Sequence, residues 1–265
     1  MGSSDSHDVG RHFVGQGRTY IRVEDGDPGR IDVEQAVESF LAGRVMVSYG
    51  LLAELEVNGR RSGEIAEAAG DEVQLKLRVL GPHWVSAERI LLFANGELVR
   101  EEAIEKADRR SQPAGVLWAD TWRLPKPPDD VHFVAVAVGP GIASLHWPTA
   151  KPYQPVSNDP STIVLGSSGA VWFDANGDGA ATPARTYAEQ VFASAKGDVP
   201  ALLAELAGYD QAVAAQAASL LQASGRSLLE EPIQRELAKA EEPTRQGFKR
   251  YLDAWRAGQL AREGG

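Results

Sequence analysis

A run of strictly alternating apolar and polar residues constrains most strongly what this chain can fold into. In Val73–Val79 every second side chain is apolar. Because successive side chains of a strand point to opposite sides, this run predicts a strand with one buried face. The turn pair Asn95-Gly96 lies between two short apolar runs and predicts a tight hairpin. The apolar run Val131–Val138 predicts a central strand, and together these patterns predict an antiparallel β-sandwich over residues 58–182.

The residues on either side of this β-rich region follow different patterns. Asp32 precedes apolar residues that are spaced as on one buried face of a helix, up to Leu41, and the run Val45–Tyr49 then predicts a strand. From residue 183 onward Ala, Leu, Glu and Gln dominate, and the apolar residues recur at helical spacing. The sequence therefore predicts an α+β fold in three parts, with an α/β segment at 1–57, the β-sandwich at 58–182 and a helical appendage at 183–265.

Composition excludes some classes of function. The chain has 265 residues and a net charge of −10, which argues against the clustered positive charge that neutralises nucleic-acid phosphates. It contains no cysteine, which excludes disulfides and thiolate metal ligands. Its apolar runs are too short to cross a bilayer. We therefore expect no nucleic-acid or membrane partner, and a cytoplasmic location for the sequence as it stands, or a periplasmic or secreted one if a signal peptide precedes it.

A short polar segment near the start contains the first candidate for metal chemistry. Asp5 and His7 are two residues apart and follow a Gly-Ser-Ser sequence. Residues i and i+2 of an extended chain point to the same side, so this carboxylate and this imidazole could bind one divalent ion. The segment also fits a flexible polar leader, because Asp-x-His is a frequent chance pattern. The pair alone leaves both interpretations open.

The residues that follow favour metal binding. The segment Gly2–Tyr20 and the helix and strand of Asp32–Gly50 resemble the end of the catalytic domain of PHP-type metallohydrolases of the carbaryl-hydrolase-like family. The resemblance is specific over residues 2–60 and looser over 61–180. It implies that residues 1–57 are the last βα element of a PHP (β/α)7-like barrel, with Asp5 and His7 as metal ligands. It also implies a zinc, manganese or iron ion that activates water to attack an ester, carbamate or phosphoester bond of a small-molecule substrate.

The other ligands that such a barrel requires are missing from the sequence. The family's pattern includes a His-x-His motif and further Glu and His ligands, and no His-x-His occurs here. A catalytic zinc site needs three protein ligands. His12, close to the motif, fits either a residue that supports the metal ligands or a surface residue, and packing is the expected role of the remaining histidines: His83, His132 and His146. The resemblance therefore implies the C-terminal part of a hydrolase, inactive alone. Its partner would be the missing N-terminal barrel portion, from the same gene or as a split subunit.

A second cation site is predicted from an internal motif. The segment from Asp174 begins Asp-x-Asn-x-Asp-Gly, as EF-hand calcium loops do, and its oxygens would converge on one ion. Arg185 stands where such a loop has a bidentate glutamate, so a calcium ion would be bound less tightly or need another ligand. Without an ion, the motif is an Asx-rich turn. The expected ligands are Asp174, Asn176, Asp178, Ala180, Thr182 and Glu189.

The calcium-loop motif leaves a second class of function open. In this alternative the chain is a non-catalytic binding module, in which a structural calcium ion stabilises the β-sandwich and the sandwich binds a partner or a glycan. The two hypotheses differ at the start of the chain. In the hydrolase Asp5 and His7 bind the catalytic metal, whereas in the binding module they belong to a polar leader.

Overall fold

The computed structural model describes residues 1–3, 16–24, 26–27, 29–105, 113–142 and 163–263. The chain divides into two compact units. The first consists of Met1–Lys126 and His132–Phe173, and the second of Pro127–Val131 and Asp174–Gly265. The fold is mixed α+β, as the sequence predicts. Within the described part of the chain, the strands form two open sheets and no closed barrel.

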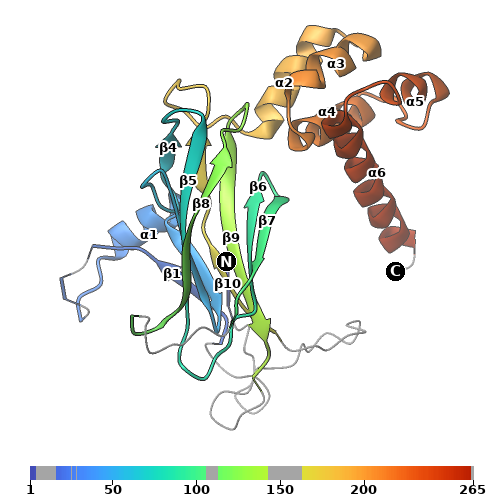
Figure 1. Cartoon of the computed structure of the whole chain (residues 1–265). Helices are drawn as coiled ribbons and strands as arrows, with labels where there is room; N and C mark the ends of the chain where they lie inside the picture. Colours follow the sequence, from blue (N-terminus) through green and yellow to red (C-terminus); the bar gives the residue numbers. More distant parts are fainter. Residues whose placement is uncertain (4–15, 25, 28, 106–112, 143–162, 264–265) are drawn as a thin grey trace. The chain divides into compact units, whose positions relative to one another are not determined.

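Two sheets make up most of the first unit (Figure 1). The larger has the order β1-β2-β10-β9-β11-β4, with β6 paired to β9 and β7 paired to β6, and the smaller has the order β3-β5-β8. The eight strands of the larger sheet are β1 (Arg18–Ile21), β2 (Val45–Tyr49), β4 (Ile65–Glu67), β6 (Arg89–Ala94), β7 (Glu97–Ala103), β9 (Val131–Pro140), β10 (Ile163–Ser168) and β11 (Val171–Asp174). The three strands of the smaller sheet are β3 (Leu52–Val57), β5 (Glu72–Leu80) and β8 (Val116–Pro125).

The local patterns in the β-rich region are confirmed. The apolar residues of Val73–Val79 lie on β5 and are at most 1% exposed, whereas the polar residues between them are partly or fully exposed. Asn95 and Gly96 join β6 to β7 with φ angles of +48° and +84°, the conformation that makes Asn-Gly favourable in hairpin turns. β9 pairs with β10 on one side and with β6 on the other, which places it inside the sheet as predicted.

The helix α1 (Val33–Leu41) forms as predicted but exposes its apolar face. Asp32 caps the first turn by accepting a hydrogen bond from the backbone N–H of Gln35 at 3.0 Å. Ser39 is 1% exposed, so the inward side of the helix is the side that carries this small polar residue. The prediction of a buried apolar stripe is therefore wrong within the described chain. Four apolar side chains of the helix are 40–78% exposed: Val33, Val37, Phe40 and Leu41.

The strand after α1 belongs to the larger sheet. β2 pairs antiparallel with β1 on one side and with β10 on the other. The segment that was expected to end a barrel is thus hydrogen-bonded to a strand from much later in the chain. The helix and the strand of this segment are confirmed, and its relation to a barrel stays a prediction.

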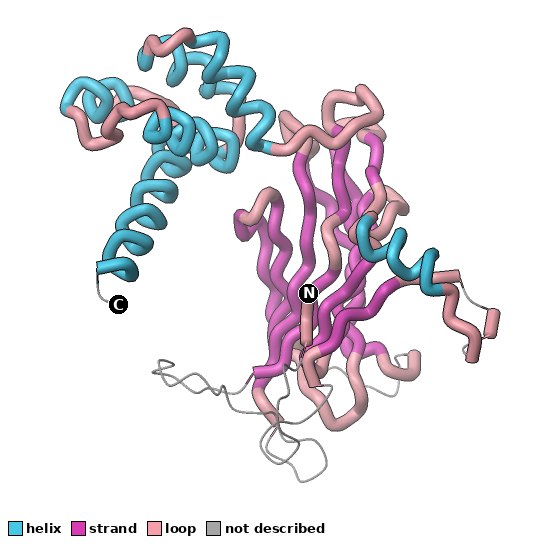
Figure 2. The backbone as a smooth tube through the Cα atoms, turned by 180° about the vertical axis from the view of Figure 1, so that it is seen from behind, coloured by secondary structure: helices cyan, strands magenta, loops and turns pink. Residues whose placement is uncertain are grey.

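The second unit is helical, as predicted from residue 183 onward (Figure 2). Its helices bury their apolar side chains against one another, with Leu206, Ala214 and Phe248 fully inaccessible to solvent. None of the helices in the described part of the chain is both long and apolar enough to cross a membrane. The helical segments are α2 (Ala184–Ala195), α3 (Val199–Glu205), the 3₁₀ turn η2 (Leu206–Gly208), α4 (Gln211–Ala223), α5 (Glu231–Leu237) and α6 (Glu242–Glu263).

Candidate metal site

The two predicted ligands of a catalytic metal, Asp5 and His7, lie outside the described residues. His83 and His132 are described, and each contacts a tryptophan ring, with ring centroids 4.8 Å and 5.2 Å apart. Contacts of this kind are typical of aromatic packing. The predicted site that can be built residue by residue is therefore the calcium-loop motif after β11.

The calcium-loop motif folds around the carboxylate of Asp174. This side chain is 0% exposed, and its two oxygens accept hydrogen bonds from the backbone N–H groups of Gly177 at 2.6 Å and Gly179 at 2.8 Å. Both glycines have φ angles of +80°, which residues with a side chain rarely adopt. Asp178 is exposed and accepts a hydrogen bond from the backbone N–H of Ala180 at 2.8 Å. The glycines of the motif thus let the backbone turn tightly around a buried negative charge.

A third carboxylate comes from a distant part of the chain. Asp130 precedes β9, is 1% exposed, and accepts hydrogen bonds from the backbone N–H groups of Ala175 at 2.8 Å and Thr182 at 2.9 Å. Ligand atoms of Asp130, Asp174 and Asp178 all lie within 4.8 Å of one another. Sequence reasoning missed Asp130 because no local pattern connects it with the loop. The available signal was an Asp-Asp pair between two prolines and a strand.

The three carboxylates could hold a metal ion. A carboxylate oxygen has two lone pairs, so an oxygen that accepts one backbone N–H can still coordinate a cation. A set of hard oxygen donors suits calcium or magnesium better than softer metals.

The hydroxyl of Tyr187 is affected by the charge of Asp130. The pKa of this hydroxyl lies above the ordinary value because burial disfavours the phenolate and the Asp130 carboxylate repels it.

The structure does not bring Glu189 to this group. Its carboxylate pairs instead with Arg185 at 2.8 Å, one turn away on α2, and both side chains are about half exposed. Asn176 uses its side-chain oxygen to accept a hydrogen bond from the backbone N–H of Asp178 at 2.9 Å. Of the predicted side-chain ligands, Asp174 and Asp178 thus belong to the three-carboxylate group, and Thr182 contributes its backbone N–H to Asp130.

Asp129, next to the group, is held in an environment that favours its protonated form. One of its oxygens is buried without a hydrogen-bond partner among the described residues. Its pKa is raised from 3.8 to about 6, first by burial and then by the negative charges of Asp210 and Asp130. The stability that protonated Asp129 contributes is therefore fully present below its ordinary pKa and is lost as the pH rises through about 6.

We expect Asp129→Asn to stabilise the protein at neutral and higher pH. The gain should be about 1 kcal/mol once the shift is discounted for partial solvent exposure, and it should vanish below about pH 4. Urea unfolding of both proteins in EDTA, at about pH 4 and about pH 8, measures the difference in the free energy of unfolding. An equal difference at the two pH values would show that Asp129 titrates normally.

Comparisons with protein-family models, with curated proteins and with solved structures found no match. The candidate site therefore stands on its own geometry. It consists of two buried carboxylates and one exposed carboxylate, brought together from two segments of the chain and oriented by backbone N–H groups.

Proposed function

We propose that the chain is the C-terminal part of a metal-dependent hydrolase and works together with an N-terminal barrel portion. In this proposal the described strands are a β-sandwich, and the helices of the second unit are an appendage to it. Asp5 and His7 would supply the last metal ligands of an active site whose other ligands come from the barrel portion. The observation that carries the proposal is the exposed apolar face of α1.

This face is unusual for a helix with such a clear apolar stripe. Helices on the surface of a globular protein normally bury their apolar side chains, but Val37 is 52% exposed and Leu41 is 78% exposed. Two apolar side chains that precede α1 in the sequence are exposed as well, Ile21 at 37% and Ile31 at 66%. Exposed apolar surface that forms a contiguous patch usually marks a site of interaction with another protein part. A barrel portion that packs on α1 would cover it.

The metal in the complete enzyme would be zinc, manganese or iron, and it would activate a water molecule for attack on an ester, carbamate or phosphoester bond. Within this chain, Asp5 would offer a carboxylate oxygen and His7 an imidazole nitrogen to that ion. In the sequence, both residues precede β1, and α1 follows β1. β1 pairs with β2 in the larger sheet. The proposal therefore assigns ligand binding and partner binding to neighbouring parts of the sequence.

Co-expression with the polypeptide encoded upstream tests the proposal. We expect the two parts to co-purify and to gain a metal-dependent hydrolytic activity that Asp5→Asn or His7→Asn removes. The double variant Val37→Glu/Leu41→Glu should weaken co-purification at least about tenfold, because it places two charges in the apolar contact. The matched control Leu98→Glu/Val99→Glu changes two apolar residues of β7 that are 48% and 46% exposed, and it should leave co-purification intact.

The opposite results would exclude this function. Turnover by the purified chain alone would show that its metal site is complete. Equal co-purification of the α1 variant and of the β7 variant would show that α1 does not contact the barrel portion. Activity that survives substitution of both Asp5 and His7 would remove them from the metal site.

A second candidate function is favoured by the three-carboxylate group. In this alternative the chain is a non-catalytic binding module with a structural calcium ion held by Asp130, Asp174 and Asp178. Calcium would then stabilise the fold whether or not a barrel portion is present. A chain that binds calcium, shows no affinity for the upstream polypeptide and has no associated hydrolysis would support this alternative over the hydrolase.

A further inference from the structure

A charged cavity in the first unit shares no lining residue with the three-carboxylate group. It has a volume of about 600 Å³ and lies where the β1–β2 end of the larger sheet approaches the β3–β5 side of the smaller one. Five cationic side chains line it, against two carboxylates, Glu54 and Glu56. The cationic side chains are Arg22, Arg44, Arg61, Lys76 and Arg78. This concentration of positive charge is unexpected in a chain with a net charge of −10.

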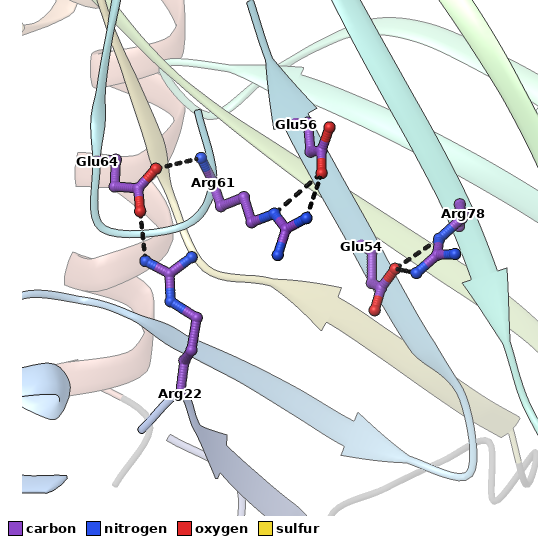
Figure 3. Close-up of polar contacts among 6 residues, drawn as sticks. All are labelled: Arg22, Glu54, Glu56, Arg61, Glu64 and Arg78. Carbon is purple, nitrogen blue, oxygen red and sulfur yellow. Dashed lines mark hydrogen bonds and ion pairs between the residues drawn. The ribbon is translucent and has the colours of Figure 1, made fainter. Parts of the chain in front are cut away.

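Three of the arginines are held in place by carboxylates. Figure 3 shows Arg78 paired with Glu54, and Arg61 paired with Glu56 at 2.9 Å. A guanidinium group has five N–H donors, and one carboxylate accepts two of them at most in a bidentate pair. Each arginine in such an ion pair therefore keeps N–H groups that can donate hydrogen bonds to a ligand. Because the ion pairs already restrict the arginine side chains, a ligand would lose less conformational entropy in ordering them.

The third ion pair holds Arg22 through Glu64, which is not itself a lining residue of the cavity. Arg22 follows β1 and contacts Glu64 at 2.5 Å, and the backbone N–H of Arg61 donates a second hydrogen bond to Glu64 at 2.9 Å. Partial burial raises the pKa of Glu64, but the hydrogen bonds from Arg61 and Arg22 outweigh this effect and keep it below the ordinary value. Glu64 is therefore ionised at neutral pH and fixes Arg22 at the edge of the cavity.

Two cations in the cavity wall are not neutralised in this way. Arg44 and Lys76 are exposed, and within the described chain neither forms an ion pair. Glu56 lies opposite Lys76 in the β3–β5 ladder, but its carboxylate is used by Arg61. Three of the five cations are thus paired with the carboxylates of Glu54, Glu56 and Glu64, and two positive charges remain without a carboxylate among the described residues. An anion in the cavity would be attracted by both charges and could accept hydrogen bonds from both side chains.

The remaining wall is largely apolar. Ile21, Val45 and Met46 line the side formed by β1 and β2. A cavity with an apolar wall and a few convergent polar groups is typical of small-molecule sites. We propose that this cavity binds a small organic anion, whose carboxylate or phosphate group contacts Arg44 and Lys76 and whose apolar body lies against Ile21, Val45 and Met46. The proposal does not depend on the hydrolase function.

Calorimetric titration of the full chain tests this proposal. The probes are the organic anions phenyl phosphate and benzoate. Inorganic phosphate serves as the control that lacks the apolar body, and benzyl alcohol as the control that lacks the charge. We expect at least one of the organic anions to bind saturably and at least about tenfold more tightly than inorganic phosphate or benzyl alcohol. Tighter binding of phenyl phosphate than of benzoate assigns the site to phosphate, and the reverse order assigns it to carboxylate.

A matched pair of variants locates the binding. Arg44→Gln/Lys76→Gln should weaken binding of the preferred organic anion at least about tenfold. The control Arg89→Gln/Lys126→Gln removes the same number of positive charges from exposed positions of the first unit outside the cavity, and it should change binding less than about twofold. Thermal unfolding of both variants checks that each remains folded, as expected for changes to exposed side chains.

Three outcomes would overturn the proposal. The first is the absence of saturable binding of either organic anion. The second is an equal loss of binding in the two double variants, which would mean that only the overall charge matters. The third is that neither organic anion binds more tightly than inorganic phosphate, which would mean that the apolar wall does not contact the ligand.

Discussion

Replacing Asp174 with alanine is expected to lower the free energy of unfolding by about 3 kcal/mol, even in the absence of a cation. The carboxylate is 0% exposed and is the acceptor for the backbone N–H groups of Gly177 and Gly179. Without it, these donors lose their acceptor and the loop loses the group around which it turns. If calcium binds at the three-carboxylate group, the same substitution should remove the stabilisation that the ion provides, because Asp174 is one of the three carboxylates.

Urea unfolding in EDTA and in calcium chloride separates these two effects. Asp178→Ala is the matched control, since Asp178 belongs to the same group but is exposed and accepts one backbone hydrogen bond from Ala180. In EDTA it should cost less than about 1 kcal/mol, while it too should reduce the stabilisation by calcium. Calcium stabilisation that persists in both variants would rule out a cation at this group. A small effect of Asp174→Ala in EDTA would show that the loop does not need its carboxylate.

The second large effect is expected at Gly139 in β9. A Cβ atom there would lie 2.0 Å from the carbonyl oxygen of Ser86 and 3.2 Å from the Cα atom of Ala87. These are backbone atoms, so no side-chain rotation can remove the clash. We expect Gly139→Ala to cost at least about 3 kcal/mol, because β9 or the backbone at 86–87 must shift.

Gly258 offers the control for this substitution. It lies within α6, and a Cβ atom there would meet no other atom within 4 Å. Gly258→Ala should stabilise the protein by about 0.5–1 kcal/mol, because alanine favours the helix and loses less backbone entropy on folding. Urea unfolding measures both changes. Equal, small effects at the two glycines would show that the segment at Ser86 does not approach β9 closely.

The parts of the fold that were predicted correctly are those encoded by neighbouring residues. The alternation in Val73–Val79 has the period of a strand, and the Asn95-Gly96 pair has the backbone freedom that its hairpin turn requires. The Asp-x-Asn-x-Asp-Gly motif likewise predicted a tight loop, and the described loop places Asp174 and Asp178 close together. Each of these features is decided within about ten residues of sequence.

The parts that were missed depend on residues that are far apart in the chain. Asp130 joins the loop by accepting a hydrogen bond from the backbone N–H of Ala175, 45 residues away. Arg44, which precedes β2, and Lys76 on β5 line one cavity only because β2 and β5 belong to sheets that approach each other. Helical periodicity identified the apolar face of α1, but periodicity shows only that a face is apolar and does not show what covers it.

The exposed face of α1 also has a consequence for the amount of this protein in a cell. Apolar surface that stays uncovered promotes aggregation, and chaperones and proteases act on chains that expose it. If the barrel portion is a separate subunit that covers Val33, Val37, Phe40 and Leu41, copies of the chain made in excess of that subunit keep these side chains exposed. Quality control would then remove the surplus, and the two polypeptides would be maintained at equal abundance without any dedicated regulator.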